Sequence, residues 1–200
     1  WSSDVCSSDL MGPIPEIYTK SLNSLISLIN ENDHLVVLGG KTSTVIPYQN
    51  EDIFDGKVGV INLSQLPKRM DITPDGDLRV LGPVDWREAR LFCESNGREI
   101  LTAPTEDTAH ILSGLATSAT GERCFGFGTL REQVVSLKYL NHKAELIELH
   151  SNNQFAIADE FKETHVRYKK SYLFYRSFKN APFPRFEKET DLLIGTEGQL

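Results

Sequence analysis

The amino-acid sequence predicts an α+β domain, in which helices and short strands are mixed along 200 residues. Apolar residues recur at helical spacing at Leu22, Leu25, Ile26 and Ile29. Residues 35–38 form a short apolar run that is typical of a buried strand. No strand candidate is followed by a GxGxxG turn, so the sequence does not predict a doubly wound parallel sheet.

Turn and cap signals set the other elements of the N-terminal half. Thr19 or Ser21 can cap the first helix, and residues 32–33 end it. Residues 58–63 and 78–81 are strand candidates, the second of them after the turn signal Asp75-Gly76-Asp77.

A second helix is predicted from Asp85, which is a suitable N-cap residue, to Gly97, which is a suitable C-cap residue. This helix would bury Trp86, Ala89, Phe92 and Cys93. Residues 134–140 and 144–149 predict a hairpin around Asn141-His142, and residues 156–175 predict a longer helix.

Composition excludes several classes of function. The net charge is -7 and the pI is about 5.3, and an acidic surface argues against nucleic-acid binding. No run of about 18 apolar residues exists, so no transmembrane segment is expected, which leaves peripheral membrane association open. The spacing of Cys6, Cys93 and Cys124 fits neither a disulfide framework nor zinc, which favours a reducing, cytoplasmic location. No metal site is expected, because the five histidines have no ligand spacing.

Residues 1–10 are rich in Ser and Asp and directly precede Met11. They lack the basic start and the apolar stretch of a signal peptide. We interpret them as a non-native leader, and the alternative is a disordered natural tail.

Three segments that contain glycine could carry chemistry. The first, Leu38-Gly39-Gly40-Lys41-Thr42-Ser43, follows a strand and would expose backbone N–H groups that bind phosphate, or it is a simple turn. The second, residues 113–129, has small residues that would let the backbone approach a flat ligand, or that serve packing. The third, residues 195–198, follows an apolar run and could be an ordinary strand exit.

The order of these segments resembles the FAD-binding domains of the vanillyl-alcohol-oxidase and glycolate-oxidase type, known as the PCMH-type family. The similar stretches are GGKTS, VGVINLS, LTAPTEDTAHILSGLATSATGERCFGFGTLREQVVSLKYL and DLLIGTEGQL, across about residues 15–200. In that family the first loop wraps the FAD pyrophosphate, the middle segment lines the pyrophosphate, ribityl chain and flavin ring, and the last lies near the adenosine.

The resemblance implies a set of cofactor-binding residues. They are Gly39, Gly40, Lys41, Thr42, Ser43, Pro104, Thr105, Ser113, Gly114, Thr117, Ser118, Gly121, Gly128, Thr129, Glu197 and Gly198. Lys41 stands where the family has a third glycine, so a positive φ there would be costly. Thr42 stands where some members attach flavin covalently through a histidine, so FAD is expected to bind non-covalently.

The resemblance also implies a domain plan. It places an N-terminal FAD-binding lobe at residues 11–82 and a larger, mostly antiparallel lobe at residues 83–200, with FAD between them. The chain would then be cut off before a substrate domain. No catalytic residue is assigned, and His110, just before the middle segment, is the one histidine whose place suggests a role.

The implied function is that of a flavin-dependent oxidoreductase, a dehydrogenase or oxidase of a hydroxy acid or alcohol. Its partners would be a small-molecule substrate and an electron acceptor. Two alternatives are a non-catalytic, flavin-poor member of the same fold that acts as an interaction module, and an enolpyruvyl-sugar reductase.

Overall fold

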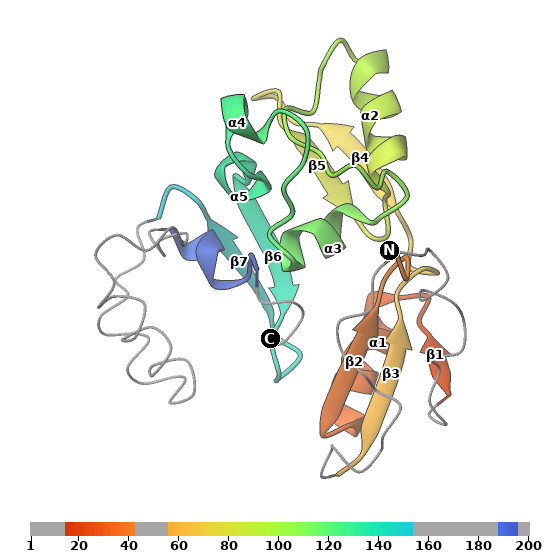
Figure 1. Ribbon diagram of the computed structural model, residues 1–200. Coiled ribbons are helices and arrows are strands. Elements are labelled where there is room, and N and C mark those ends of the chain that lie inside the picture. The colour runs from red at the N-terminus through yellow and green to blue at the C-terminus, as the bar shows by residue number, and fades with distance from the viewer. Residues whose placement is uncertain (1–14, 43–55, 154–187, 196–200) are drawn as a thin grey trace.

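The computed structural model describes residues 15–42, 56–153 and 188–195 (Figure 1). Helices and small sheets alternate along these residues, as the sequence predicts for an α+β domain. The leader at residues 1–10, the helix expected at 156–175 and the site residues Ser43, Glu197 and Gly198 lie outside the described residues.

A parallel three-stranded sheet forms the N-terminal part. It contains β1 (Glu16–Tyr18), β2 (His34–Leu38) and β3 (Val58–Asn62), and β3 is the central strand. Val60 and Ile61 of the central strand β3 are fully buried, and because successive side chains point to opposite faces, both faces of this strand are covered. The strands expected at 35–38 and 58–63 are confirmed, whereas β1 was not predicted.

Helix α1 (Leu22–Glu31) connects β1 to β2. Of the two expected caps, Ser21 is the N-cap residue, and its side chain accepts a hydrogen bond from the Ser24 backbone at 3.1 Å. The helix ends at Asn32, as predicted.

A hairpin and a helix follow. Strands β4 (Arg69–Ile72) and β5 (Leu78–Leu81) are antiparallel, and Gly76 turns between them with a φ of +91°. Helix α2 (Trp86–Ser95) begins after its N-cap residue Asp85, and Gly97 follows its end with a φ of +66°. The strand predicted at residues 78–81 and the helix predicted from Asp85 to Gly97 are confirmed, whereas β4 was not predicted.

Short elements fill the rest of the described chain. They are α3 (Ile111–Ala116), α4 (Cys124–Phe127), α5 (Leu130–Gln133), β6 (Ser136–Leu140), β7 (Leu146–His150) and the 3₁₀ helix η4 (Glu189–Leu192). The β6–β7 pair is the predicted antiparallel hairpin. Its turn is held by the Asn141 side-chain oxygen, which accepts from the backbone of Lys143 and Glu145 at 2.9 Å each.

Two clusters of buried apolar side chains lie among the described residues. One is in the parallel sheet and contains Val36, Leu38 and Val60. The other is built from Val84, Trp86, Ala89, Ile111 and Leu130, with Met70, Leu78 and Val80 packed against it.

This second cluster therefore draws in β4 and β5, which the expected boundary at residue 82 assigns to the N-terminal lobe. The division into two lobes stays a prediction. Within the described ranges, no helix combines the length and the apolar character that a membrane span requires.

Candidate functional site

The first glycine loop meets the start of the middle segment. Gly39 and Gly40 follow β2, whose last residue accepts a hydrogen bond from the Leu63 backbone at 3.0 Å. A Cβ on Gly39 would lie 2.7 Å from the Ser113 hydroxyl oxygen and 3.3 Å from Nδ1 of His110. The fold thus brings together two predicted segments that are about 70 residues apart in the sequence.

Lys41 has the positive φ that the sequence analysis considered, at 56°. Left-handed backbone costs a residue with a side chain about 1–2 kcal/mol. The Lys41 ammonium donates to Oε1 of Glu16 at 2.5 Å, and the Asn62 side chain donates to Oε2 of the same carboxylate at 3.0 Å. Burial raises the pKa of Glu16, but hydrogen bonds from Lys41, Asn62 and Tyr18 hold it below its ordinary value.

Glu16 therefore holds the Lys41 ammonium within the protein. The sequence did not identify Glu16 as the partner of this lysine.

The middle segment begins in a helix, α3, which the sequence did not predict. Helix α3 ends in a Schellman motif, in which Ser118 donates to the Leu115 carbonyl at 3.1 Å and Ala119 donates to Gly114 at 2.8 Å. Ser118 takes the left-handed position of this motif, with a φ of 50°. Gly, and sometimes Asn, is the usual residue at that position, and here Ser118 takes its place.

Gly114 and Thr117 have partners inside the protein. Gly114 is buried against Trp86, whose Cζ2 would lie 2.9 Å from a Cβ on the glycine. The Thr117 hydroxyl donates to the Ser113 carbonyl at 3.1 Å, within the same turn of chain. The packing explanation that the sequence left open therefore accounts for Gly114.

Gly121 is where two loops cross. A Cβ on Gly121 would lie 2.5 Å from the carbonyl carbon of Ala103 and 2.9 Å from Cα of Pro104, and closer still to the Ala103 oxygen. Ala103 and Glu122 form an isolated antiparallel bridge at the same place. The absence of a side chain at Gly121 thus lets the Pro104–Thr105 turn lie directly on the middle segment.

Gly128 and Thr129 form the entry to α5. Gly128 has a φ of +78°, and its carbonyl accepts from the Thr102 hydroxyl at 2.9 Å. Thr129 and Glu132 form a capping box, and the Thr129 backbone donates to the Glu132 carboxylate at 2.6 Å. Both residues therefore fix the start of a helix.

The terminal segment reaches the same region through Gly195. Its N–H donates to the Leu115 carbonyl at 3.1 Å, and a Cβ on it would lie 3.3 Å from Cβ of Ser118. Beneath it, Arg131 pairs with Asp191 at 2.9 Å. Neither charged residue was predicted, although Arg131 follows Gly128 and Thr129 closely in the sequence.

His110 lies between the glycine loop and α2. Its Cδ2 and Nε2 atoms would be 3.5 Å from a Cβ on Gly40. Burial lowers the pKa of His110, although the carboxylates of Asp85 and Glu88 oppose this effect. Burial thus favours the neutral form of the imidazole, which has one donor nitrogen and one acceptor nitrogen.

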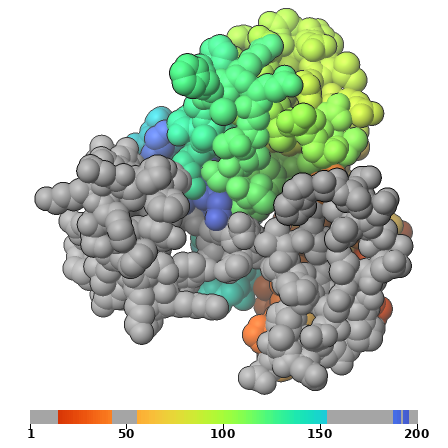
Figure 2. All heavy atoms as spheres, in the orientation of Figure 1, coloured from red at the N-terminus to blue at the C-terminus, as the bar shows by residue number. Residues whose placement is uncertain are grey.

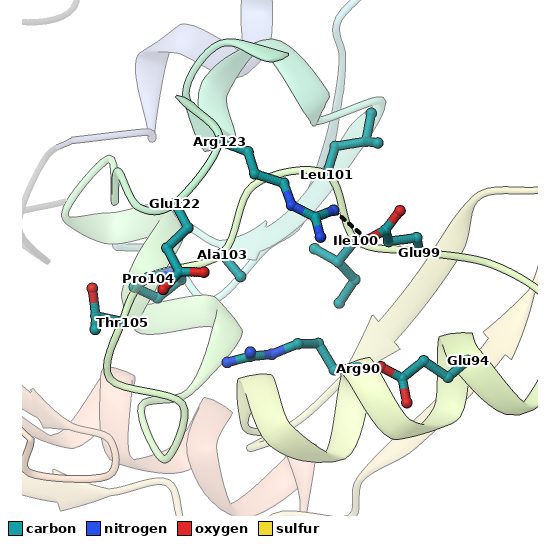
Figure 3. Close-up of a pocket in the computed structure, with 10 residues that line it drawn as sticks. All are labelled: Arg90, Glu94, Glu99, Ile100, Leu101, Ala103, Pro104, Thr105, Glu122 and Arg123. Carbon is teal, nitrogen blue, oxygen red and sulfur yellow. Dashed lines mark hydrogen bonds and ion pairs between the residues drawn. The ribbon is translucent and has the colours of Figure 1, made fainter. Parts of the chain in front are cut away.

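A small pocket lies between α2 and the loops at residues 99–105 and 121–124 (Figure 3). Arg90 and Glu94 enter it from α2, while Arg123 faces them and pairs with Glu99. Its volume is about 190 Å³, whereas pockets that enclose drug-sized ligands measure about 300–1,000 Å³. Pro104 and Thr105 line it, but this pocket is too small to be the whole site for a dinucleotide.

No protein-family model matches the sequence, and no curated protein matches it. Solved structures match the fold. 6-Hydroxy-D-nicotine oxidase from Arthrobacter nicotinovorans matches with a TM-score of 0.58 and 13% identity, over 72% of this chain and 32% of the oxidase chain. Alkyldihydroxyacetonephosphate synthase matches with a TM-score of 0.60 and 12% identity, over 92% of this chain and 29% of the synthase chain.

The chain shares the fold of these solved structures, which is the PCMH-type fold that the sequence led us to expect. A second crystal form of the synthase gives the same TM-score and coverage at 13% identity. At such identities the likeness establishes the PCMH-type fold alone. The chain spans about a third of the length of these solved chains.

Proposed function

We propose that this chain is the FAD-binding part of a flavin-dependent oxidoreductase and that it binds FAD non-covalently. The loop from Gly39 to Ser43 would hold the pyrophosphate, and the Pro104–Thr105 turn would lie beside the flavin ring. The fold supports this proposal, because it is one that flavoenzymes use for FAD.

Gly40 is the observation that carries the proposal. Its φ is outside the left-handed region, so the backbone does not require glycine there. A Cβ on Gly40 would make only ordinary contacts, 3.5 Å from His110 and from the Thr108 carbonyl. Because the protein itself does not demand a glycine at this position, a ligand that approaches the backbone closely would explain its presence.

The donors near Gly40 suit a diphosphate. Backbone N–H groups of a loop after a strand can bind phosphate oxygens without a side-chain charge. Lys41 is bound to Glu16, so these N–H groups and the Thr42 hydroxyl would provide the contacts. Bound FAD would supply a ring that accepts a hydride from a reduced substrate and then passes electrons to an acceptor.

The rest of the mechanism is a narrower proposal. We expect the substrate to be a hydroxy acid or an alcohol. We also expect the protein to be located in the cytoplasm. His110 is the one described histidine near the loop, and its neutral imidazole would orient the loop or a ligand. We assign no catalytic base.

A titration with FAD tests the proposal. The full chain should quench FAD fluorescence with saturation, and acid denaturation should release the flavin into the supernatant. Gly40→Ala should weaken FAD binding by about ten-fold or more, which is about 1.4 kcal/mol, and leave the thermal midpoint unchanged.

Gly97→Asn is the matched control, because nothing lies within 4 Å of a Cβ there, asparagine tolerates its positive φ, and this glycine lies outside the three proposed cofactor segments. This variant should bind FAD as the parent does. No saturable binding by the parent would refute the proposal. Equal affinity of Gly40→Ala and the parent would remove the loop from the site, and flavin on the precipitated protein would contradict non-covalent binding.

A flavin-poor member of the fold is the second candidate, and two observations favour it. Lys41 has a left-handed backbone and forms an ion pair with Glu16, and Gly114 packs against Trp86. Both reduce the groups that are available to a ligand. Such a protein would not quench FAD fluorescence with saturation in the titration. A cooperative thermal unfolding transition would show that it is nevertheless folded.

A further inference from the structure

The pocket beside α2 contains an arginine with an unused donor. Arg90 is partly buried, and its Nε atom is buried without a hydrogen-bond partner among the described residues. An unpaired buried donor is unfavourable, so an acceptor that reaches it is bound favourably. Asp107 lies near Arg90, but both of its carboxylate oxygens accept hydrogen bonds from Arg87, at 3.0 and 3.2 Å. Arg90 therefore retains the capacity to bind an acceptor from outside the chain.

Carboxylates with unused capacity line the same pocket. Figure 3 shows the Arg90 side chain extending from α2 toward the part of the pocket where Glu122 lies. Within the described ranges, the side chains of Glu122 and Glu94 form no hydrogen bond or ion pair with the protein. Arg123 and Glu99, by contrast, bind each other. The pocket thus presents one guanidinium and two carboxylates that have no ion-pair partner in the described part of the chain.

The walls between these groups are partly apolar and are held in place. Ile100 and Ala103 line the pocket and pack against the larger buried cluster. The bridge between Ala103 and Glu122 and the close approach at Gly121 hold the two loops together. Glu122 is exposed, and Figure 2 shows the green atoms of the middle segment uncovered at the surface. A ligand can therefore reach the pocket from solvent.

The size of the pocket limits the ligand. Its volume of about 190 Å³ corresponds to roughly six water molecules at about 30 Å³ each. A molecule of that size has room for two charged groups and little else. An anion alone would be repelled by Glu94 and Glu122, and a cation alone would be repelled by Arg90. The charges of the pocket are therefore complementary to a molecule that carries both signs.

We propose that this pocket binds a small zwitterion, an α-amino acid of the size of glycine or alanine. Its carboxylate lies across Nε and one Nη of Arg90, in the two-point geometry that guanidinium groups use for carboxylates. Its ammonium pairs with Glu122, and its side chain contacts Ile100. The site requires no flavin, so this inference goes beyond the proposed function.

Titration of the full chain in the absence of FAD tests the site. The probes are L-alanine, propionate, which has only the carboxylate, and ethylamine, which has only the ammonium. The ionic strength is held constant, because salt screens exposed charges. L-alanine should bind with saturation and about ten-fold or more tightly than either other probe. In NMR spectra of the arginine side chains, L-alanine should shift one Nε–H signal, which should be absent in Arg90→Gln.

Two variants assign the charges. Arg90→Gln and Glu122→Gln should each weaken L-alanine binding by about ten-fold or more. Glu122→Gln should also reduce the preference for L-alanine over propionate, because it removes a like charge from the carboxylate. Glu122 is exposed, so this variant covers the case in which Arg90→Gln fails to fold. Arg79→Gln, which removes an exposed partner of Asp71 on the β4–β5 hairpin, is the control and should change no affinity.

The outcomes are independent of FAD binding. No saturable binding of L-alanine by the folded parent would overturn the inference, and so would equal affinities for L-alanine and propionate. Unchanged L-alanine affinity in either folded pocket variant would overturn it as well. A failure of the FAD titration would overturn only the proposed function.

Discussion

Gly121→Ala is the substitution for which the structure gives the clearest cost. The new methyl group would lie 2.5 Å from the Ala103 carbonyl carbon and 2.9 Å from Cα of Pro104, where carbon atoms normally stay about 3.5 Å apart or more. Because the Ala103 oxygen would be closer still, the two backbone segments must separate by more than about 1 Å. Overpacking of this kind costs about 1–3 kcal/mol, and more where backbone must move.

Thermal unfolding monitored by circular dichroism measures this cost. For a chain of this size, 3 kcal/mol corresponds to a fall of roughly 6–12 °C in the unfolding midpoint. Gly126→Ala is the control for this stability measurement, because its methyl group meets nothing within 4 Å. A midpoint for Gly121→Ala within about 1 °C of the parent would show that the two loops do not cross as described.

Three further predictions concern an ion pair, packing and protonation. Lys41→Met should lower stability by at most about 1 kcal/mol at pH 7. The difference should vanish in melts at low pH, because the contribution of Glu16 is complete above its ordinary pKa of 4.5 and is lost as the pH falls through its lower folded value. Gly114→Ala should cost about 1–3 kcal/mol and change tryptophan fluorescence through contact with Trp86; an unchanged spectrum and midpoint would contradict the packing. Acidification below the ordinary His110 pKa of 6.5 should destabilise the parent more than His110→Gln, because the folded protein disfavours protonation; equal acid sensitivity would refute this.

The sequence predicted those helices and strands whose formation depends on spacing and capping within the segment itself. The helical spacing from Leu22 to Ile29 and the cap at Asp85 predicted α1 and α2 with nearly their observed bounds. Strand β1 escaped prediction because it has only three residues, two of them exposed, and it exists through its pairing with β3. Helix α3 escaped because Ser113 and Gly114 are poor helix formers, and packing against Trp86 outweighs their propensity.

The candidate site divides in the same way. The family pattern, in which a glycine is usual at this position, raised the cost of a positive φ at Lys41, and the structure shows a φ of 56° there. Its ion pair with Glu16 spans 25 residues and depends on the order of strands in the sheet, which no local pattern encodes. The contact of Gly39 with Ser113 and the pairing of Arg131 with Asp191 are tertiary in the same sense.

The central place of β3 in the parallel sheet also has a consequence for folding during synthesis. Strands β1 and β2 leave the ribosome first, but each pairs with β3 and not with the other. The bond from Leu63 to the Leu38 carbonyl, which anchors the end of β2 before Gly39, therefore forms only after a further 25 residues have been added. A nascent chain that ends before residue 58 would carry Gly39, Gly40 and Lys41 without the strand that orders them. The first loop is thus expected to take its shape after translation of β3, and not as its own residues emerge.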